Sequence, residues 1–112
     1  MGTHEYEEDS RNSDIWISIN GVLYRRADAK ISVFDAGFLL GDGVWEAFRL
    51  HRGKLVFLDD HLQRLFHGAR VISLDIGRTK GELVDEIERV IEANKMVDDV
   101  HIRLIVSRGL KP

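Results

Sequence analysis

The spacing of apolar residues changes twice along this chain, and those changes constrain its fold more than any other feature. Apolar residues alternate in short runs up to about residue 57, follow a helical period from Asp59 to Asn94, and alternate again over Val100–Ser107. Alternation indicates strands, whereas a period near 3.6 indicates amphipathic helices. The sequence therefore predicts an α+β fold, with a largely antiparallel sheet that carries two helices on one face.

The first residues of the chain offer little to a hydrophobic core. Residues 1–13 contain almost no apolar side chain besides Tyr6, and four acids lie within residues 5–9. Such a segment cannot offset the entropy that it would lose on ordering. We therefore predict a disordered acidic tail over residues 1–13, with ordered structure beginning near Ile15.

Two short turns are predicted to join strands into hairpins. Asn20-Gly21 best tolerates the two positive φ angles of a type I′ turn. The link His51-Arg52-Gly53 allows a second hairpin, with Gly53 in the left-handed conformation. The strands expected in these hairpins are residues 15–19 with 22–24, and residues 44–50 with 54–57.

Two amphipathic helices are predicted between the second hairpin and the last strand. Asp59 is placed to cap the first helix, and Asp59-Asp60 is explained by capping rather than by acid–base chemistry. Thr79 and Glu82 have the spacing of a capping box for the second helix, which should end near Asn94. The apolar faces are Leu62, Leu65, Phe66, Ala69 and Ile72 in the first helix, and Leu83, Val84, Ile87, Val90 and Ile91 in the second.

Composition narrows the possible functions. A chain of 112 residues with 44% apolar content matches one domain. Its net charge of −3 and pI near 5.9 argue against a nucleic-acid partner. The acidic start is the reverse of a signal peptide, and no apolar run is long enough to span a membrane, so a cytoplasmic protein is expected. Cysteine is absent and no two histidines have helical metal-ligand spacing, so no metal site is predicted.

Two segments carry a resemblance to a known family. Residues 34–49 include the turn Leu40-Gly41-Asp42-Gly43 and the strand that follows it, and residues 60–65 read Asp-His-Leu-Gln-Arg-Leu. Together they resemble the N-terminal small domain of the class IV (fold-type IV) aminotransferases, the group of branched-chain, D-amino-acid and (R)-amine transaminases. The resemblance covers roughly residues 15–112.

This resemblance implies a pyridoxal 5′-phosphate enzyme that moves an amino group between an amino acid or amine and a 2-oxo acid. It assigns residues 14–112 to the small domain and places the larger C-terminal domain, with the Schiff-base lysine, beyond Pro112. No catalytic residue is then expected in this chain, which would be inactive alone. Family sites are completed at a subunit interface, so a homodimer is expected as well.

In the family's helix motif an arginine binds the cofactor phosphate, and that arginine falls on Arg64. A guanidinium is planar and permanently charged, so it can make paired hydrogen bonds to a phosphate. Arg64 is also expected beside the buried helical stripe, within reach of the sheet edge. The alternative is a surface arginine that pairs with Asp60, four residues earlier.

The resemblance also places Leu40 and Trp45 on the substrate side. The aromatic residue at the position of Trp45 usually lines the family's substrate pocket, where tyrosine or phenylalanine is common. Judged by residue type alone, Trp45 is more typical of a hydrophobic core. In its strand Trp45 and Glu46 point to opposite faces, and each face mixes polar with apolar residues. Such a strand is expected to be covered on both sides by a larger protein.

His101 and Arg103 share one face of the last strand, opposite Ile102, Leu104 and Val106. Branched-chain family members have tyrosine, isoleucine and arginine here, on the substrate-carboxylate side, so Arg103 matches and His101 does not. D-amino-acid members tend to have histidine first, which leaves the subclass open. The alternative is a solvated outer strand face.

Two other functions remain open. The small domain of 4-amino-4-deoxychorismate lyase, which has the same fold, also ends a strand in Ser-Arg-Gly, as residues 107–109 do. A non-catalytic interaction domain is the second alternative, because a fold alone does not establish catalysis.

Overall fold

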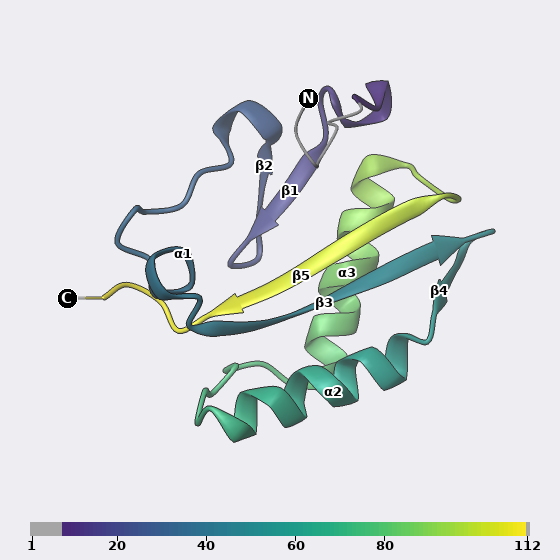
Figure 1. The fold of residues 1–112 in the computed structure, drawn as a ribbon. Helices are drawn as coiled ribbons and strands as arrows, with labels where there is room; N and C mark the ends of the chain where they lie inside the picture. The colour runs from purple at the N-terminus through teal and green to yellow at the C-terminus, as the bar shows by residue number, and fades with distance from the viewer. Residues whose placement is uncertain (1–7, 112) are drawn as a thin grey trace, which may run out of the picture.

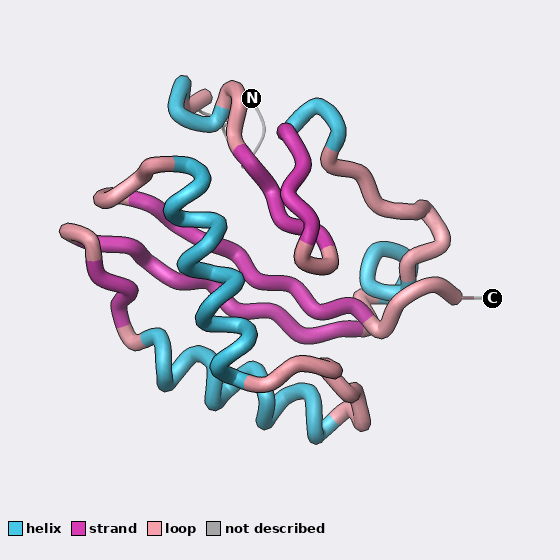
Figure 2. The backbone as a smooth tube through the Cα atoms, turned by 180° about the vertical axis from the view of Figure 1, so that it is seen from behind, coloured by secondary structure: helices cyan, strands magenta, loops and turns pink. Residues whose placement is uncertain are grey.

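The computed structural model describes residues 8–111 and has an α+β architecture, as predicted (Figure 1). One antiparallel sheet has the strand order β4-β3-β5, and β1 and β2 form a separate two-stranded sheet. Figure 2 shows both long helices on one face of the three-stranded sheet. The strands are β1 (Trp16–Ile19), β2 (Val22–Arg25), β3 (Gly43–His51), β4 (Lys54–Val56) and β5 (Val100–Ser107); the helices are η1 (Ser10–Asn12), η2 (Arg26–Asp28), α1 (Ala36–Leu40), α2 (Leu58–Val71) and α3 (Lys80–Asn94).

The core lies between β3 and the two long helices. Phe48 of β3 is fully buried and packs among apolar side chains from α2 and α3. Ile102, Leu104 and Val106 of β5 pack against the same cluster, which confirms the inward face predicted from their alternation. The centre of the core is formed by Phe48, Leu62, Leu65, Leu83 and Ile87.

The first hairpin has the predicted turn. Asn20 and Gly21 have φ angles of 53° and 81°, and Ile19 pairs with Val22. The hairpin is attached to α3, because the backbone N–H of Trp16 donates to Asn94 Oδ1 at 2.8 Å and Asn94 Nδ2 donates back to the Trp16 carbonyl at 3.0 Å. Asn94, expected only as a helix end, thus anchors a second sheet.

The second hairpin is tighter than predicted. His51 pairs with Lys54, so only Arg52 and Gly53 form the turn, with φ angles of 50° and 77°. The expected three-residue link was wrong by one residue, because His51 continues the β3 ladder. β4 ends at Val56 rather than at the predicted Phe57, which takes a left-handed conformation.

The beginning of α2 also differs from prediction. The helix begins at Leu58, and its N-cap is Phe57, with φ 53° and no side-chain capping bond. The predicted cap by Asp59 was wrong, since Asp59 lies inside the first turn and forms an ion pair with Lys80. The capping box of α3 is confirmed, with Glu82 N–H donating to Thr79 Oγ1 at 3.1 Å and Thr79 N–H donating to Glu82 Oε1 at 2.9 Å.

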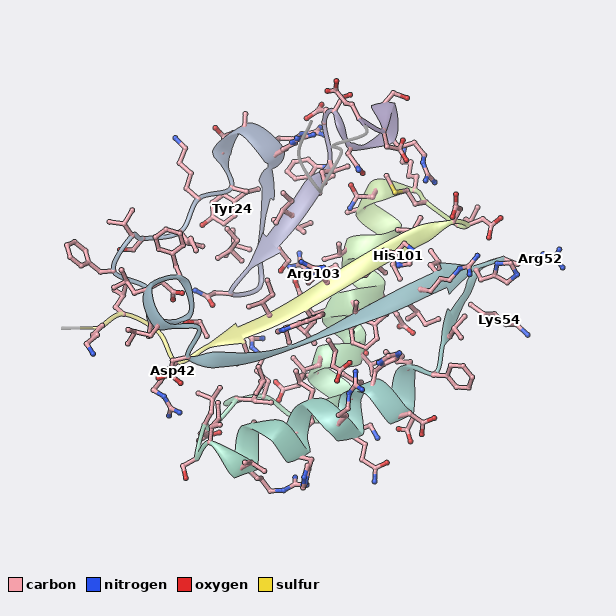
Figure 3. All side chains as sticks on the ribbon, viewed as in Figure 1. Tyr24, Asp42, Arg52, Lys54, His101 and Arg103 are labelled. Carbon is pink, nitrogen blue, oxygen red and sulfur yellow. The ribbon has the colours of Figure 1, made fainter. Side chains whose placement is uncertain are left out.

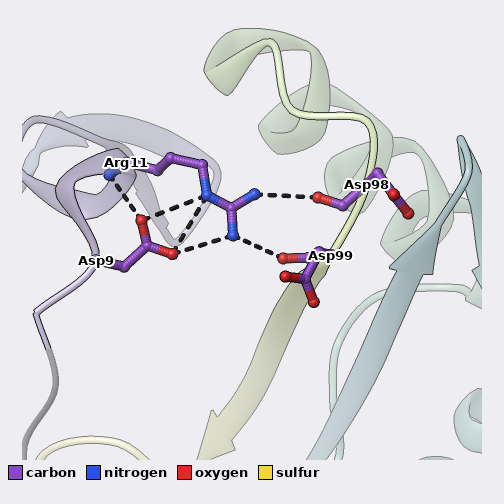
Figure 4. Close-up of polar contacts among 4 residues, drawn as sticks. All are labelled: Asp9, Arg11, Asp98 and Asp99. Atoms are coloured by element: carbon purple, nitrogen blue, oxygen red, sulfur yellow. Dashed lines mark hydrogen bonds and ion pairs between the residues drawn. The ribbon is translucent and has the colours of Figure 1, made fainter.

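Residues 8–13 are more ordered than the predicted tail. Arg11 lies in the short helix η1, and its guanidinium donates to the carbonyl oxygens of Asp98 and Asp99 at 3.1 and 2.8 Å (Figure 4). Asp9 pairs with the same guanidinium at 3.0 Å. One long cation therefore ties this segment to the loop before β5, an interaction that apolar content could not reveal. Residues 1–7 of the predicted tail lie outside the described residues.

Candidate functional site

A buried carboxylate on β3 organises the charged side chains in the first half of α2. Glu46 is only 3% exposed and accepts hydrogen bonds from Arg64 Nε at 2.5 Å and Arg64 Nη2 at 2.8 Å. The Glu46 Oε2 atom also lies 2.9 Å from His61 Nδ1. His61 and Arg64 are three residues apart in α2 and therefore share a face of the helix. A strand and a helix together form this cluster.

The cluster keeps Glu46 ionised. The Arg64 hydrogen bonds are the largest cause that lowers the pKa of Glu46 below its ordinary value, and the His61 contact acts in the same direction, whereas burial opposes both. Because a carboxylate can only accept hydrogen bonds, His61 Nδ1 carries the hydrogen in this contact. The negative charge of Glu46 is thus compensated by Arg64 and by the hydrogen bond from His61.

Arg64 lies where the sequence predicted, beside the buried stripe of α2 and at the side of the sheet. Its partner is Glu46, however, and not Asp60, so the alternative of a pair within the helix was wrong. The Arg64 side chain is 73% exposed even though its partner is buried. It borders an open depression of about 320 Å³ on α2, which is lined by Asp60, Gln63, Arg64, His67 and Arg70.

Trp45, His101 and Arg103 lie on the outer face of the sheet, away from the helices. Trp45 pairs with Ile105, and Ala47 pairs with Arg103, which sets Trp45 and Arg103 diagonally across the two strands. The Arg103 guanidinium carbon lies 5.0 Å from the centre of the Trp45 ring, within cation–π range. Trp45 is 60% exposed, so the alternative of a core tryptophan does not hold in this chain.

His101 is on the same face as Arg103, two residues before it on β5 (Figure 3). The structure therefore confirms the shared face that the alternation predicted. Glu46, the partner of Arg64, and Trp45 are consecutive residues of β3 and point to opposite faces of the sheet. Leu40 is the last residue of α1, three positions before β3 begins, and is 61% exposed.

A network of hydrogen bonds fixes the turn that leads into β3. Asp35 caps α1 by accepting from the backbone N–H of Phe38 at 3.0 Å, and Ser107 Oγ donates to the other carboxylate oxygen at 2.7 Å. Arg108 Nε donates to Asp42 Oδ2 at 2.8 Å, and Arg108 Nη2 donates to the carbonyl of Ile72 at 2.6 Å. Ser107 and Arg108 thus have structural partners within this chain.

These contacts bear on the lyase alternative. Its sequence basis was the tripeptide at residues 107–109, and the contacts of Ser107 and Arg108 account for two of those residues without any substrate. Ser107 and Arg108 therefore have structural roles within this chain.

Comparison with known proteins decides the family. A model of the family described as amino-transferase class IV matches residues 43–112. The chain belongs to the class IV aminotransferase family. It is 40% identical over 94 residues to a protein of Methanocaldococcus jannaschii provisionally named as a branched-chain-amino-acid aminotransferase, and the alignment covers 84% of this chain and 32% of that protein.

Other members show the same relation. The chain is 34% identical over 96 residues to a D-alanine aminotransferase of Staphylococcus epidermidis, covering 86% of this chain and 34% of that protein. A crystal structure of the branched-chain aminotransferase of Thermoproteus uzoniensis with norvaline is 28% identical, with a TM-score of 0.76, and the alignment covers 83% of this chain and 33% of that one. The chain thus spans about a third of the length of these class IV aminotransferases.

A Schiff-base lysine is expected in a desolvated site that lowers its pKa. Every lysine of the chain is exposed, and Lys80 is paired with Asp59. Within residues 8–111, no helix is long and apolar enough to cross a membrane.

Glu46 and His61 were missed as site residues in the sequence. A usable signal was present. Glu46 lies two residues from both Val44 and Phe48 in its strand, so its side chain points to the same, buried face. A buried acid is rare unless it is paired. That rule would have predicted a basic partner for Glu46, although it could not have identified which one.

The stability of this class IV domain should depend on Glu46 in acid. Because its folded-state pKa is lowered, Glu46 contributes stability above the pKa of an unfolded glutamate, about 4.3, and that contribution is lost as the pH falls through the lower folded value. When the pH is lowered from about 6 to about 3, we expect the free energy of unfolding to fall less for Glu46→Gln than for the parent chain. Denaturant unfolding at both pH values measures this difference.

Glu88→Gln, at an exposed position of α3, is the control for removing one carboxylate. It should follow the parent chain across the same pH range. Equal losses for the parent chain and Glu46→Gln would contradict the pairing of Glu46 with Arg64 and His61.

Proposed function

We propose that the complete polypeptide containing residues 1–112 is a pyridoxal 5′-phosphate-dependent aminotransferase. It would transfer an amino group between an amino acid or amine and a 2-oxo acid. The observation that carries the proposal is the arginine of the family's helix motif, Arg64, which is both held by a buried carboxylate and 73% exposed. An arginine so placed suits a phosphate, which needs a charged donor open to solvent.

Different residues of this chain would bind the cofactor and the substrate. Arg64 would hold the cofactor phosphate. Arg103 would meet the substrate carboxylate, with Trp45 shaping the pocket beside it, and His101 and Leu40 would contribute to the same side. Bound pyridoxal phosphate supplies the electron sink for amino-group transfer. The larger C-terminal domain would supply the Schiff-base lysine.

A homodimer is part of the proposal. Trp45 and Glu46, the partner of Arg64, point to opposite faces of β3, so this chain alone does not enclose a small substrate between Arg64 and the Trp45 and Arg103 pair. A second copy could bring the outer face of its sheet to the site that holds Arg64. Exposed apolar side chains of the chain include Ile31, Val33, Phe34, Phe38, Leu39, Leu40 and Leu110, a surface suited to burial by the larger domain or by a second copy.

The test is a half-reaction with the complete polypeptide and pyridoxal phosphate. We expect an amino donor to change the visible absorbance of the bound cofactor, and a 2-oxo acid to reverse the change. Branched-chain L-amino acids, D-alanine and a carboxylate-free amine should be tried in parallel. Bound cofactor with no donor-dependent change would support a non-catalytic domain, and release of pyruvate from 4-amino-4-deoxychorismate would support the lyase; either result overturns the proposal.

Arg103→Ala tests the carboxylate assignment in the same assay. Loss of paired hydrogen bonds between charged groups should lower kcat/KM for amino-acid donors about 10- to 100-fold. An amine without a carboxylate serves as the control, because it has nothing for Arg103 to bind. An equal loss for both kinds of donor would show that Arg103 is structural. Light scattering on the same sample tests the homodimer.

A further inference from the structure

Within residues 8–111, the contacts of Arg64 leave one edge of its guanidinium without a partner. A guanidinium carries five N–H groups: one on Nε and two on each of Nη1 and Nη2. Glu46 takes the Nε hydrogen and one Nη2 hydrogen, at 2.5 and 2.8 Å. The second Nη2 hydrogen and one Nη1 hydrogen lie together along the next edge of the group. That edge offers two parallel donors to a further anion.

The carboxylate that holds Arg64 is itself fixed from several sides. Glu46 lies in the middle of β3, opposite Leu104 of β5, and is 3% exposed. His61 holds its Oε2 atom at 2.9 Å, and the His61 ring packs edge-on against Phe48 with 5.5 Å between ring centres. The side chain that orients Arg64 is therefore anchored in the core, although Arg64 is largely exposed.

We propose that Glu46 is a positioning residue for the cofactor phosphate, an inference that rests on the proposed function. By holding the Nε/Nη2 edge, Glu46 fixes a long and otherwise flexible side chain before the ligand arrives. The Nη1/Nη2 edge is then presented to two oxygens of the phosphate. His61 supports this arrangement by holding the carboxylate and does not touch the phosphate.

Two physical effects of Glu46 on phosphate binding have opposite signs, which makes the inference testable. As a nearby negative charge, Glu46 repels a phosphate dianion, so its neutralisation would tighten binding. As an anchor, Glu46 removes the entropy cost of ordering Arg64, so its loss would weaken binding. The anchoring effect is the larger one, because Glu46 bonds directly to the guanidinium whereas the phosphate lies beyond it.

The experiment compares pyridoxal phosphate with pyridoxal, which lacks the phosphate. Dissociation constants are measured by absorbance titration of the complete polypeptide, for the parent and for the isosteric variant Glu46→Gln. We expect about tenfold weaker binding of pyridoxal phosphate and about unchanged binding of pyridoxal. Tighter or unchanged binding of pyridoxal phosphate overturns the proposal. An equal loss for both ligands also overturns it, since that result indicates a general disturbance of the fold.

Asp60→Asn is the matched control for charge. Asp60 is a carboxylate in the first turn of α2, beside the same depression, and it is not the partner of Arg64. Its neutralisation removes one negative charge without releasing Arg64, so binding of pyridoxal phosphate should be unchanged or slightly tighter. A loss equal to that of Glu46→Gln would contradict the positioning role.

Arg64→Ala separates this inference from the function on which it rests. Suppose that Arg64→Ala weakens the binding of pyridoxal phosphate but not that of pyridoxal. If Glu46→Gln then has almost no further effect in the Arg64→Ala background, the two residues act as one unit. If Arg64→Ala is selective but Glu46→Gln alone is silent, only the positioning role fails. If Arg64→Ala still binds pyridoxal phosphate more tightly than pyridoxal, by the same factor as the parent, then Arg64 does not bind the phosphate.

An independent readout is the Nε–H resonance of Arg64 in the complete polypeptide labelled with ¹⁵N-arginine. In the parent this proton should exchange slowly with solvent because Glu46 accepts its hydrogen bond. In Glu46→Leu, whose side chain has no acceptor, it should exchange rapidly while the amide spectrum stays that of a folded protein. Unchanged exchange in a folded Glu46→Leu variant would show that Glu46 does not hold Arg64.

Discussion

Replacing Phe48 with alanine should destabilise this chain by about 3–5 kcal/mol, the usual cost of removing a fully buried aromatic ring. Phe48 is 0% exposed and contacts the core from the centre of β3. The cavity would lie where α2 and α3 both pack on β3. A shift of one helix to fill the cavity would break its contacts with the other helix. Small domains are stable by about 5–15 kcal/mol in total, so much of the chain's stability would be lost.

Denaturant unfolding followed by circular dichroism measures this loss. Phe38→Ala is the matched control, because Phe38 is the same residue type in α1 but is 64% exposed. Its replacement should change the free energy of unfolding by no more than about 0.5 kcal/mol. Similar losses for the two variants would contradict the assigned core.

Most of the fold could be predicted because its elements are determined locally. The turn at Asn20 and Gly21 and the capping box at Thr79 depend on residues within a few positions of one another. The inward face of β5 follows from simple alternation. Each of these features was predicted from sequence and is present in the structure.

The features that were missed depend on contacts between distant residues. α1 has only five residues, and its cap Asp35 is held by Ser107, which lies 72 positions away. The start of α2 shifted because Phe57 adopts a left-handed conformation, which residue preferences do not favour. Neither feature can be predicted without knowing how the elements pack.

The candidate site shows the same division. The family motif located Arg64, and alternation placed His101 and Arg103 on one face. The partner of Arg64 could not be predicted, because Glu46 lies 18 positions earlier and meets it only when α2 docks on β3. The contact between Arg103 and Trp45 likewise requires the register of β3 against β5. Both contacts join residues of different elements, and the sequence alone does not show how those elements pack.

A close approach between β3 and β5 predicts the second large effect, at Gly43. A Cβ atom at this position would lie 2.4 Å from the carbonyl oxygen of Val106 and 3.2 Å from the Cα of Ser107. Both are backbone atoms, so a side chain cannot simply rotate away and the strands must shift. Gly43→Ala should therefore destabilise the chain by about 1–3 kcal/mol, as overpacking usually does.

Gly68→Ala provides a control with the opposite expected sign. Gly68 lies inside α2, and an added Cβ would meet only Val44 Cγ1, at 3.4 Å. Alanine is favoured over glycine in a helix interior by about 1 kcal/mol, so this variant should be as stable as the parent or more stable. Thermal unfolding of the two variants measures the contrast. A neutral Gly43→Ala, or equal losses at both positions, would contradict the close contact between β3 and β5 at Gly43.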